Sequence, residues 1–245
     1  LRWAMHPHLK PEGLITLISR RSTTLYSGMI PGLIAGRYRA DEVAIDLRQL
    51  ADKSGVAFLL GEIKHVEASC SELILEGRPS ISFTQLSIDV GSETCWMANN
   101  SCYLNSFEAM PIRPLENSLA WIRSQDSQSL LPNALPFTVV GAGLTGFEVV
   151  LSIRHRWPSR KLLLQAYPNQ PCKEFRRALL DADIELLSSD SSLNGPALFC
   201  TGNRAPSWLE ASGFPVDVSG RVRTTKTLQI IGTSNIFGVG DCAVL

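Results

Sequence analysis

The chain lacks an excess of charge of either sign, because its 245 residues carry 23 Lys and Arg against 23 Asp and Glu. A net charge of zero gives no electrostatic basis for binding nucleic acid or an anionic membrane, and nucleic acid is not expected as a partner. The chain also has no run of about 20 apolar residues, the length that a transmembrane helix needs, and no signal peptide at its start. Its 44% apolar content excludes a disordered chain, and its length fits one or two domains.

Cysteine and histidine are few and scattered. No two cysteines have C-x-x-C spacing, and the four histidines form no cluster beyond His6 and His8. A zinc site or a redox disulfide is therefore not expected, and no metal is predicted. We interpret the cysteines as small buried residues in a reducing, cytoplasmic compartment; they stand at positions 70, 95, 102, 172, 200 and 242. Cys102 and Cys242 are weighed for thiol chemistry, but neither has an evident base beside it.

The first part of the chain alternates apolar runs with short helical patterns. Residues 14–18 and 56–60 are continuous apolar runs, which is typical of fully buried parallel strands. Asp46 can cap a helix over residues 47–53. Residues 63–90 contain short runs with partial alternation, which predict an antiparallel meander. A polar connection over residues 91–112 follows.

A second α/β pattern begins after this connection. A helix is expected over residues 115–123, and strands and helices then alternate in the order of a parallel sheet. The expected strands are 137–140, 161–165, 184–187 and 197–200, the helices are 144–157 and 175–181, and the tail adds strands at 222–224 and 236–239.

The strongest local motif is Gly141-Ala142-Gly143-Leu144-Thr145-Gly146, which follows an apolar strand and opens a helix. This is the context that a dinucleotide-binding G-x-G-x-x-G requires. Gly141 would allow the tight turn, Gly143 would let the backbone approach a pyrophosphate, and Gly146 would let the helix pack closely. The helix start would then present free N–H groups to the phosphates.

Two side chains near this turn are further candidates for contact with the nucleotide. Glu148 lies early in the helix, where it could face the nicotinamide or could be a solvated or capping glutamate. Gln165 ends the next strand, where an acidic residue usually binds the adenosine ribose 2′-hydroxyl. Because Gln165 is neutral, it leaves NADH and NADPH both open.

Several ordered motifs together resemble a known family. They are the glycine-rich turn with Phe147 and Glu148, Cys200-Thr201-Gly202, the loop 26–32 (Tyr-Ser-Gly-Met-Ile-Pro-Gly), Ile88-Asp89-Val90-Gly91-Ser92, and residues 236–243, which contain Gly240 and Asp241. The chain is similar to the two-dinucleotide-binding-domain flavoproteins of the pyridine nucleotide-disulfide oxidoreductase superfamily. Within it the chain looks like the type II NADH dehydrogenase branch, and most like the FAD-dependent module fused to selenide, water dikinase.

This resemblance implies further cofactor contacts. It places Gly240 and Asp241 at the ribityl and pyrophosphate region of FAD, and the loop containing Tyr26, Gly28 and Pro31 beside the flavin. It also places the backbone at Ile63 against the adenine. Thr201 and Gly202, like residues 89–91, resemble crossing turns between the two domains.

The sequence also departs from the family pattern. The family opens with its own G-x-G-x-x-G/H loop for FAD, and this chain begins beyond it and stops just after Gly240-Asp241, so both ends look truncated. On that basis we expect the chain to hold FAD poorly. A C-x₄-C redox pair is missing, which argues against a disulfide reductase.

These observations predict an α/β protein with two Rossmann-like three-layer (ββα) domains of FAD/NAD(P)-binding type, the first one incomplete. Residues 1–112 and 216–245 would form the FAD-binding-type domain, and residues 113–215 the NAD(P)-binding domain. The expected function is an FAD-dependent NAD(P)H oxidoreductase that passes a hydride from nicotinamide to flavin and on to a quinone or another small acceptor. A fused or associated selenophosphate synthetase domain is a further expected partner. The alternatives are a non-catalytic nucleotide-binding or regulatory module and a truncated fragment of such an enzyme.

Overall fold

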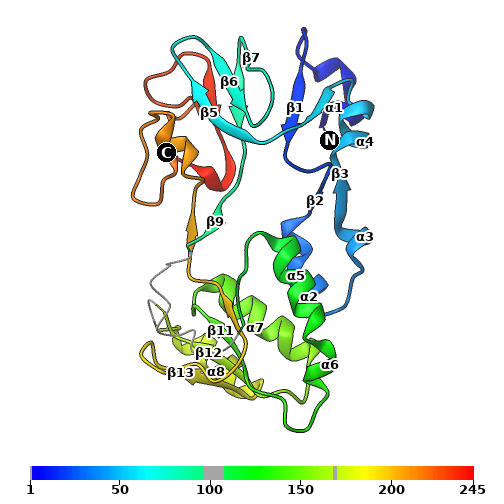
Figure 1. The fold of residues 1–245 in the computed structure, drawn as a ribbon, viewed down its shortest axis with the longest axis vertical. Coiled ribbons are helices and arrows are strands. Elements are labelled where there is room, and N and C mark those ends of the chain that lie inside the picture. Colours follow the sequence, from blue (N-terminus) through cyan, green and yellow to red (C-terminus); the bar gives the residue numbers. More distant parts are fainter. Residues whose placement is uncertain (1, 96–107, 168–169) are drawn as a thin grey trace. The chain divides into compact units, whose positions relative to one another are not determined.

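The computed structural model describes residues 2–95, 108–167 and 170–245 (Figure 1). The chain folds into two compact units, each assembled from separate stretches of sequence. Unit 1 is Leu1–Tyr26, Ala44–Ser92 and Arg204–Leu245, and unit 2 is Ser27–Val43 and Glu93–Asn203. A compact unit of the fold need not have the same boundaries as a cofactor-binding domain. The boundaries given above for the FAD-binding-type and NAD(P)-binding domains therefore stay a prediction.

Unit 2 is built on a five-stranded parallel sheet with the order β10-β14-β11-β12-β13. Figure 1 labels its strands β11, β12 and β13. The strands are β10 (Ala109–Pro111), β11 (Phe137–Val140), β12 (Leu162–Gln165), β13 (Ile184–Leu187) and β14 (Ala197–Phe199). All residues of β11, β12 and β14 are buried, as expected for the central strands of a parallel sheet. The helices α7 (Leu144–Arg156) and α8 (Lys173–Asp181) make the crossovers from β11 to β12 and from β12 to β13.

Further helices complete the described part of unit 2. They are α2 (Ile30–Ile34), α3 (Ala40–Val43), α5 (Leu115–Ser124) and α6 (Asp126–Ser129). Helix α2 packs against α7, and α5 packs against β10. The segment 27–43 therefore joins unit 2 although unit 1 flanks it on both sides in the sequence.

Unit 1 contains small sheets. Parallel pairs are β1 (Thr16–Ser19) with β4 (Ala57–Leu60), β8 (Leu86–Ile88) with β17 (Ile236–Gly238), and β16 (Val222–Arg223) with β18 (Ala243–Val244). Antiparallel pairing joins β2 (Thr23–Leu25) to β3 (Ala44–Asp46), and β5 (Ile63–Glu67), β6 (Glu72–Leu75) and β7 (Ile81–Ser82) to one another. The helices of unit 1 are α1 (Arg2–Met5), α4 (Leu47–Lys53) and α9 (Trp208–Ala211). The short strand β9 (Glu93–Thr94), at the start of the longer stretch of unit 2, pairs with β15 (Asn203–Arg204), whose Asn203 ends that stretch.

One core in unit 1 joins elements that are distant in the sequence. Val66, Leu73 and Ile88 pack with Leu209 and Ile236, and each of them is at most 2% exposed. The meander β5-β6-β7 thus packs against both α9 and the β8–β17 pair. Burial of these apolar side chains is the dominant force that holds the separate stretches of unit 1 together.

The structure confirms most of the expected elements. Asp46 caps α4, since its Oδ1 accepts the backbone N–H of Gln49 at 2.9 Å. Two expectations were wrong. The strand near residues 14–18 is parallel but not fully buried, because Leu14 is 90% exposed and β1 pairs with β4 alone. The last run of the predicted meander, β8, instead pairs in parallel with β17, a pairing of long sequence separation that local alternation cannot indicate.

The cysteines also differ from the expectation of general burial. Cys200 and Cys242 are buried, whereas Cys70 and Cys172 are exposed, and Cys102 lies outside the described residues. Burial raises the pKa of the Cys200 thiol to about 12 and also raises that of Cys242, so both are poor thiolates at neutral pH.

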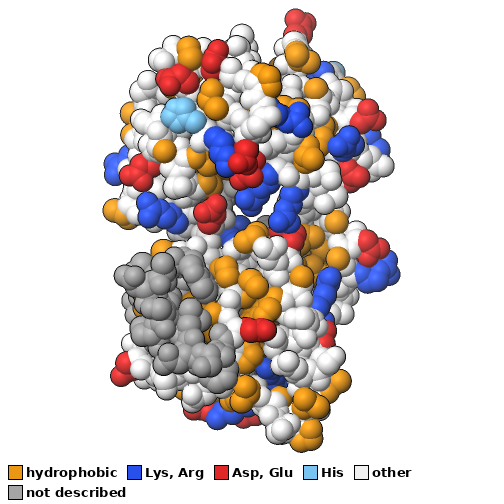
Figure 2. All heavy atoms as spheres, in the orientation of Figure 1, with side chains coloured by type: hydrophobic (Ala, Val, Ile, Leu, Met, Phe, Trp, Pro, Cys, Tyr) orange, Lys and Arg blue, Asp and Glu red, His pale blue; other side chains and the backbone are white. Residues whose placement is uncertain are grey.

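On the face shown in Figure 2, Lys and Arg side chains lie interspersed with Asp and Glu side chains. Neither sign of charge dominates that face, in keeping with the zero net charge. Within the described ranges, no helix combines the length and the apolar character needed to cross a bilayer.

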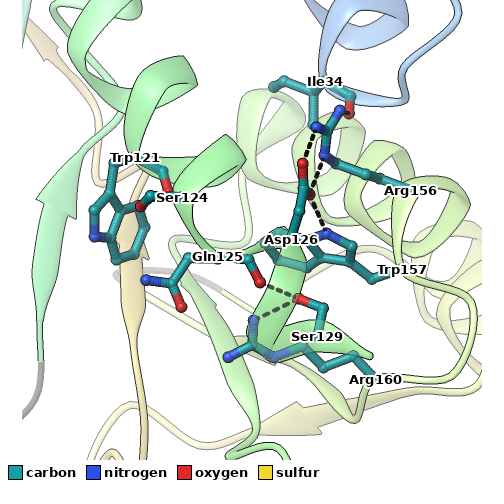
Figure 3. Close-up of polar contacts among 9 residues, drawn as sticks. All are labelled: Ile34, Trp121, Ser124, Gln125, Asp126, Ser129, Arg156, Trp157 and Arg160. Atoms are coloured by element: carbon teal, nitrogen blue, oxygen red, sulfur yellow. Dashed lines mark hydrogen bonds and ion pairs between the residues drawn. The ribbon is translucent and has the colours of Figure 1, made fainter. Parts of the chain in front are cut away.

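A half-buried polar network joins α6 and the end of α7 in unit 2 (Figure 3). Asp126 accepts hydrogen bonds from Arg156 Nε at 2.7 Å and from Trp157 Nε1 at 2.8 Å. Arg156 also donates to the backbone oxygen of Ile34, which ties α2 to the same cluster. Burial by itself would raise the pKa of Asp126, but the Arg156 and Trp157 hydrogen bonds outweigh it, and the pKa is lowered.

Replacing Asp126 with asparagine is expected to destabilise the fold at neutral pH and much less in acid. A carboxyl group whose folded pKa is lowered adds stability above its unfolded pKa and loses it as the pH falls through the folded value. The free energy of unfolding in urea, measured for both proteins between pH 7 and pH 3, checks this. A difference between the two proteins that stays constant over this range would contradict it.

Candidate nucleotide-binding site

The strand order of unit 2 defines where a ligand can bind. From β11 the chain moves outward through β12 and β13, and it then returns to place β14 on the other side of β11. In open parallel sheets, ligands bind at the carboxyl ends of the strands where the order reverses in this way. Here that point lies between the ends of β11 and β14, where residues 141–146 and 200–202 follow the two strands.

The glycines at 141 and 146 are required by close approaches within the turn. Gly141 has φ of +112°, and a Cβ there would lie 2.4 Å from the backbone oxygen of Cys200. A Cβ on Gly146 would lie 1.8 Å from the backbone oxygen of Gly141. The turn therefore packs against the end of β14, and neither position has room for a side chain.

Gly143 is different, because nothing lies within 4 Å of the position that its Cβ would occupy. Its φ of −74° is open to any residue, and it is exposed. The structure thus leaves open space over Gly143, where the motif would bring a pyrophosphate against the backbone. Of the described side chains, none caps the N-terminus of α7, so the N–H groups of its first turn can bind an anion.

The other residues predicted near the nucleotide lie around this turn. Thr145 and Glu148 are exposed on the first turns of α7. Thr201 follows β14, and its hydroxyl donates to the backbone oxygen of Cys95 at 2.8 Å. The backbone oxygen of Gly202 accepts the N–H of Cys95. Thr201 and Gly202 therefore connect the end of β14 to the segment that runs from unit 1 into unit 2.

Gln165 ends β12 as predicted, but its side chain is only 2% exposed. Its amide nitrogen lies 3.2, 3.4 and 2.9 Å from the backbone oxygens of Ser188, Ser189 and Ser191. The amide thus holds the loop that follows β13. Contact of Gln165 with a ribose stays a prediction, and this geometry leaves no amide N–H free for it.

The loop of residues 188–191 and a stacked aromatic pair were missed by the sequence reasoning. The hydroxyl groups of Ser188 and Ser191 are 3.0 Å apart. Phe147 on α7 and Phe175 on α8 stack with their ring centroids 3.9 Å apart, which fixes the two helix starts relative to each other. The Ser-Ser-Asp-Ser-Ser run directly after a parallel strand was the available signal for the loop.

In unit 1, two carboxylates meet at the carboxyl ends of β8 and β17. Asp89 follows β8, and Gly240 and Asp241 follow β17. Gly240 has φ of +69°, and a Cβ there would lie 2.4 Å from Asp89 Oδ1, so the turn accepts only glycine. Ser92 Oγ donates to Asp241 Oδ2 at 3.4 Å. Burial, and next the charge of Asp241, raise the pKa of Asp89.

Replacing Asp89 with asparagine is expected to raise stability at neutral pH slightly. A carboxyl group with a raised folded pKa stabilises the fold when protonated, and this contribution is lost as the pH rises through the folded value. Asparagine keeps the shape without the charge. Urea unfolding at pH 7 and pH 3.5 checks the prediction: the variant should exceed the wild type only at pH 7, and a less stable variant at pH 7 would contradict it.

The remaining candidates fall in different units. Tyr26 is 56% exposed, and Ile63 begins β5 and packs against the unit 1 core. Gly28 lies in the 3₁₀ turn Ser27–Met29, and Pro31 lies in the first turn of α2, both in unit 2. The flavin contacts predicted for these residues stay predictions.

Comparison with known proteins gives one curated relative and many similar structures. No protein-family model matches the chain. The chain is 24% identical to demethylphylloquinone reductase NdbB from Synechocystis sp., over 96% of this chain and 65% of that protein. The chain therefore spans less than two thirds of the length of this relative.

The solved structures agree on the fold. NDH2 from Plasmodium falciparum in complex with NADH matches with a TM-score of 0.75 and 16% identity, over 94% of this chain and 59% of that one. Putidaredoxin reductase in a covalent complex with putidaredoxin matches with a TM-score of 0.79 and 14% identity, over 95% of this chain and 62% of that one. The water-forming NADH oxidase from Lactobacillus brevis, bound to NADH, matches with a TM-score of 0.74 and 16% identity, over 98% of this chain and 58% of that one. The chain has the mixed α/β fold of the FAD/NAD(P)-binding, Rossmann-like oxidoreductases.

Proposed function

We propose that this chain belongs to an FAD-dependent NAD(P)H oxidoreductase of the NADH dehydrogenase type. The observation that carries the proposal is the glycine-rich turn at the point where the strand order reverses. Gly141 and Gly146 have no room for a Cβ, while Gly143 is open, exposed and at the start of an uncapped helix. Among the described residues, this is the arrangement that accepts a dinucleotide pyrophosphate.

In this proposal each unit holds one cofactor. The first turn of α7, with Thr145 and Glu148 beside it, binds NAD(P)H at residues 141–146. In unit 1, the Asp89 and Asp241 carboxylates can each accept hydrogen bonds from ligand hydroxyl groups, which would fit the ribityl chain of FAD. Two adjacent carboxylates would repel a diphosphate, so they do not fit the pyrophosphate. Bound FAD would supply the two-electron acceptor for the nicotinamide hydride.

The acceptor and the partners are part of the same proposal. A quinone acceptor is supported by the similarity to a demethylphylloquinone reductase. An associated selenophosphate synthetase domain and a cytoplasmic location rest on the sequence expectations alone. Because the chain covers 65% of the curated relative, the activity stays part of this proposal.

Binding and turnover measurements test the proposal. The chain is titrated with NADH and NADPH by calorimetry, and is then incubated with FAD and assayed for NADH oxidation with a water-soluble naphthoquinone. We expect nucleotide binding to a single site. We expect oxidation to require the quinone together with FAD added in excess, because the chain is expected to hold FAD poorly. Binding without turnover would favour the non-catalytic nucleotide-binding module, and absence of binding to either nucleotide would overturn the site.

A further inference from the structure

A side chain other than Gln165 is needed to distinguish the 2′-hydroxyl of NADH from the 2′-phosphate of NADPH. The Gln165 side chain is 2% exposed and its amide nitrogen is occupied by three backbone oxygens. Residues 166–172, which follow β12, are Ala, Tyr, Pro, Asn, Gln, Pro and Cys, and none is acidic. The usual position of the acid that accepts the 2′-hydroxyl is therefore neutral.

The loop that Gln165 holds brings an acid to this edge from another strand. β13 lies beside β12 in parallel register, with Leu187 opposite Gln165. Asp190 stands between Ser189 and Ser191, whose backbone oxygens lie within 3.4 Å of the Gln165 amide nitrogen. The Asp190 side chain is exposed. A hydrogen bond from Ser188 lowers its pKa, so the carboxylate is charged at neutral pH.

We propose that Asp190, positioned at the carboxyl end of β12 by Gln165, interacts with the ribose 2′ position and selects NADH over NADPH. The inference rests on the proposed function of residues 141–146. A carboxylate accepts a hydrogen bond from the 2′-hydroxyl of NADH and repels the 2′-phosphate of NADPH, which carries a charge of about −2. The acid that contacts the ribose thus comes from the loop after β13 rather than from the end of β12.

The charged residues of α8 are the competitors for this role. Arg176 donates to the backbone oxygen of Pro171 and to Gln170 Oε1, so it is engaged with the segment after β12. Lys173, Glu174 and Arg177 are exposed on α8. The hydrogen bonds of the Gln165 side chain connect the end of β12 to the loop that carries Asp190. They do not go to Lys173, Glu174 or Arg177.

The test compares two probes that bind without any redox chemistry, ADP-ribose and 2′-phospho-ADP-ribose. The wild type should bind ADP-ribose more tightly than 2′-phospho-ADP-ribose. The ratio is the affinity for ADP-ribose divided by that for 2′-phospho-ADP-ribose, and Asp190→Asn should reduce this ratio about tenfold. Asp183→Asn is the matched control, because Asp183 is an exposed acid just before the opposite end of β13. Its φ of +53° suits asparagine equally well, and the ratio should not change.

A second variant tests the positioning role of Gln165. Gln165→Met keeps the length of the side chain but removes the donor, so the ratio should fall as in Asp190→Asn. Amide hydrogen exchange of residues 188–191 should become faster at the same time. A merely structural role would change the exchange without changing the ratio, and that result would overturn the positioning of Asp190.

The other outcomes are equally decisive. An unchanged ratio in Asp190→Asn overturns the inference, and so does a fall in the ratio caused by Glu174→Gln instead. Either result would leave the proposed function standing, since the probes would still bind. If the wild type binds neither probe, the proposed function fails as well.

Discussion

Replacing Gly143 with valine is expected to abolish NAD(P)H binding while leaving the fold intact. The backbone of Gly143 is in a region open to any residue, and its Cβ position is empty to 4 Å, so the protein has room for a side chain to leave the backbone there. The same space is where a pyrophosphate would meet the backbone. We expect affinity for NADH to fall by at least about 100-fold. Loss of the glycine at the helix N-cap should cost only about 1 kcal/mol of stability.

Gly146→Ala is the contrasting variant for this experiment. Its Cβ would lie 1.8 Å from the backbone oxygen of Gly141, so the turn itself would have to move. Calorimetric titration with NADH and a thermal unfolding curve for each variant separate the two effects. Gly143→Val should lose binding at nearly the wild-type melting temperature, whereas Gly146→Ala should melt at a lower temperature. Unchanged NADH affinity in Gly143→Val would show that the nucleotide binds elsewhere.

The sequence predicted unit 2 well because its signals are local. The strand over residues 137–140, the glycine-rich turn and the following helix are adjacent in the chain, and each matches the structure within a residue or so. The conformation of Gly141 follows from the motif itself, because a tight turn between strand and helix needs a positive φ. Alternation of strands and helices then fixed the parallel order of β11, β12 and β13.

The features that the sequence did not predict depend on interactions between residues far apart in the chain. That Gln165 faces a protein loop rather than a ligand follows from how residues 188–191 fold over the end of β12. The partner of β8 is β17, almost 150 residues away, so local alternation suggested the wrong neighbour. The Asp89 and Asp241 pair depends on the same long-range pairing. Motifs could name Asp241 as a candidate, but only the fold shows that Asp89 packs against Gly240.

Removal of Arg160 is expected to cause the largest loss of stability among the polar residues of unit 2. Arg160 is 3% exposed, and it donates to Ser129 Oγ at 2.8 Å and to the backbone oxygen of Leu135 at 3.1 Å (Figure 3 shows the Ser129 contact). Its guanidinium also lies 5.3 Å from the ring centroid of Phe137 and 5.0 Å from that of Trp157. Arg160→Ala would leave a cavity and remove the donor that the buried Ser129 hydroxyl and the partly buried Leu135 carbonyl share, at a cost of about 3 kcal/mol.

Arg160→Met separates packing from charge in this prediction. Burial lowers the pKa of Arg160, and its guanidinium donates to the neutral oxygens of Ser129 and Leu135, so the buried charge itself is costly. Methionine restores contact with the two rings without that charge, and should recover roughly half of the loss.

The control is Arg177→Ala, which removes an exposed arginine on α8 and should change stability by less than about 0.5 kcal/mol. Urea unfolding followed by tryptophan fluorescence measures all three variants, because Trp157 packs directly against Arg160. A loss below about 1 kcal/mol for Arg160→Ala would mean that the hydrogen bonds and ring contacts do not offset the cost of burying the guanidinium.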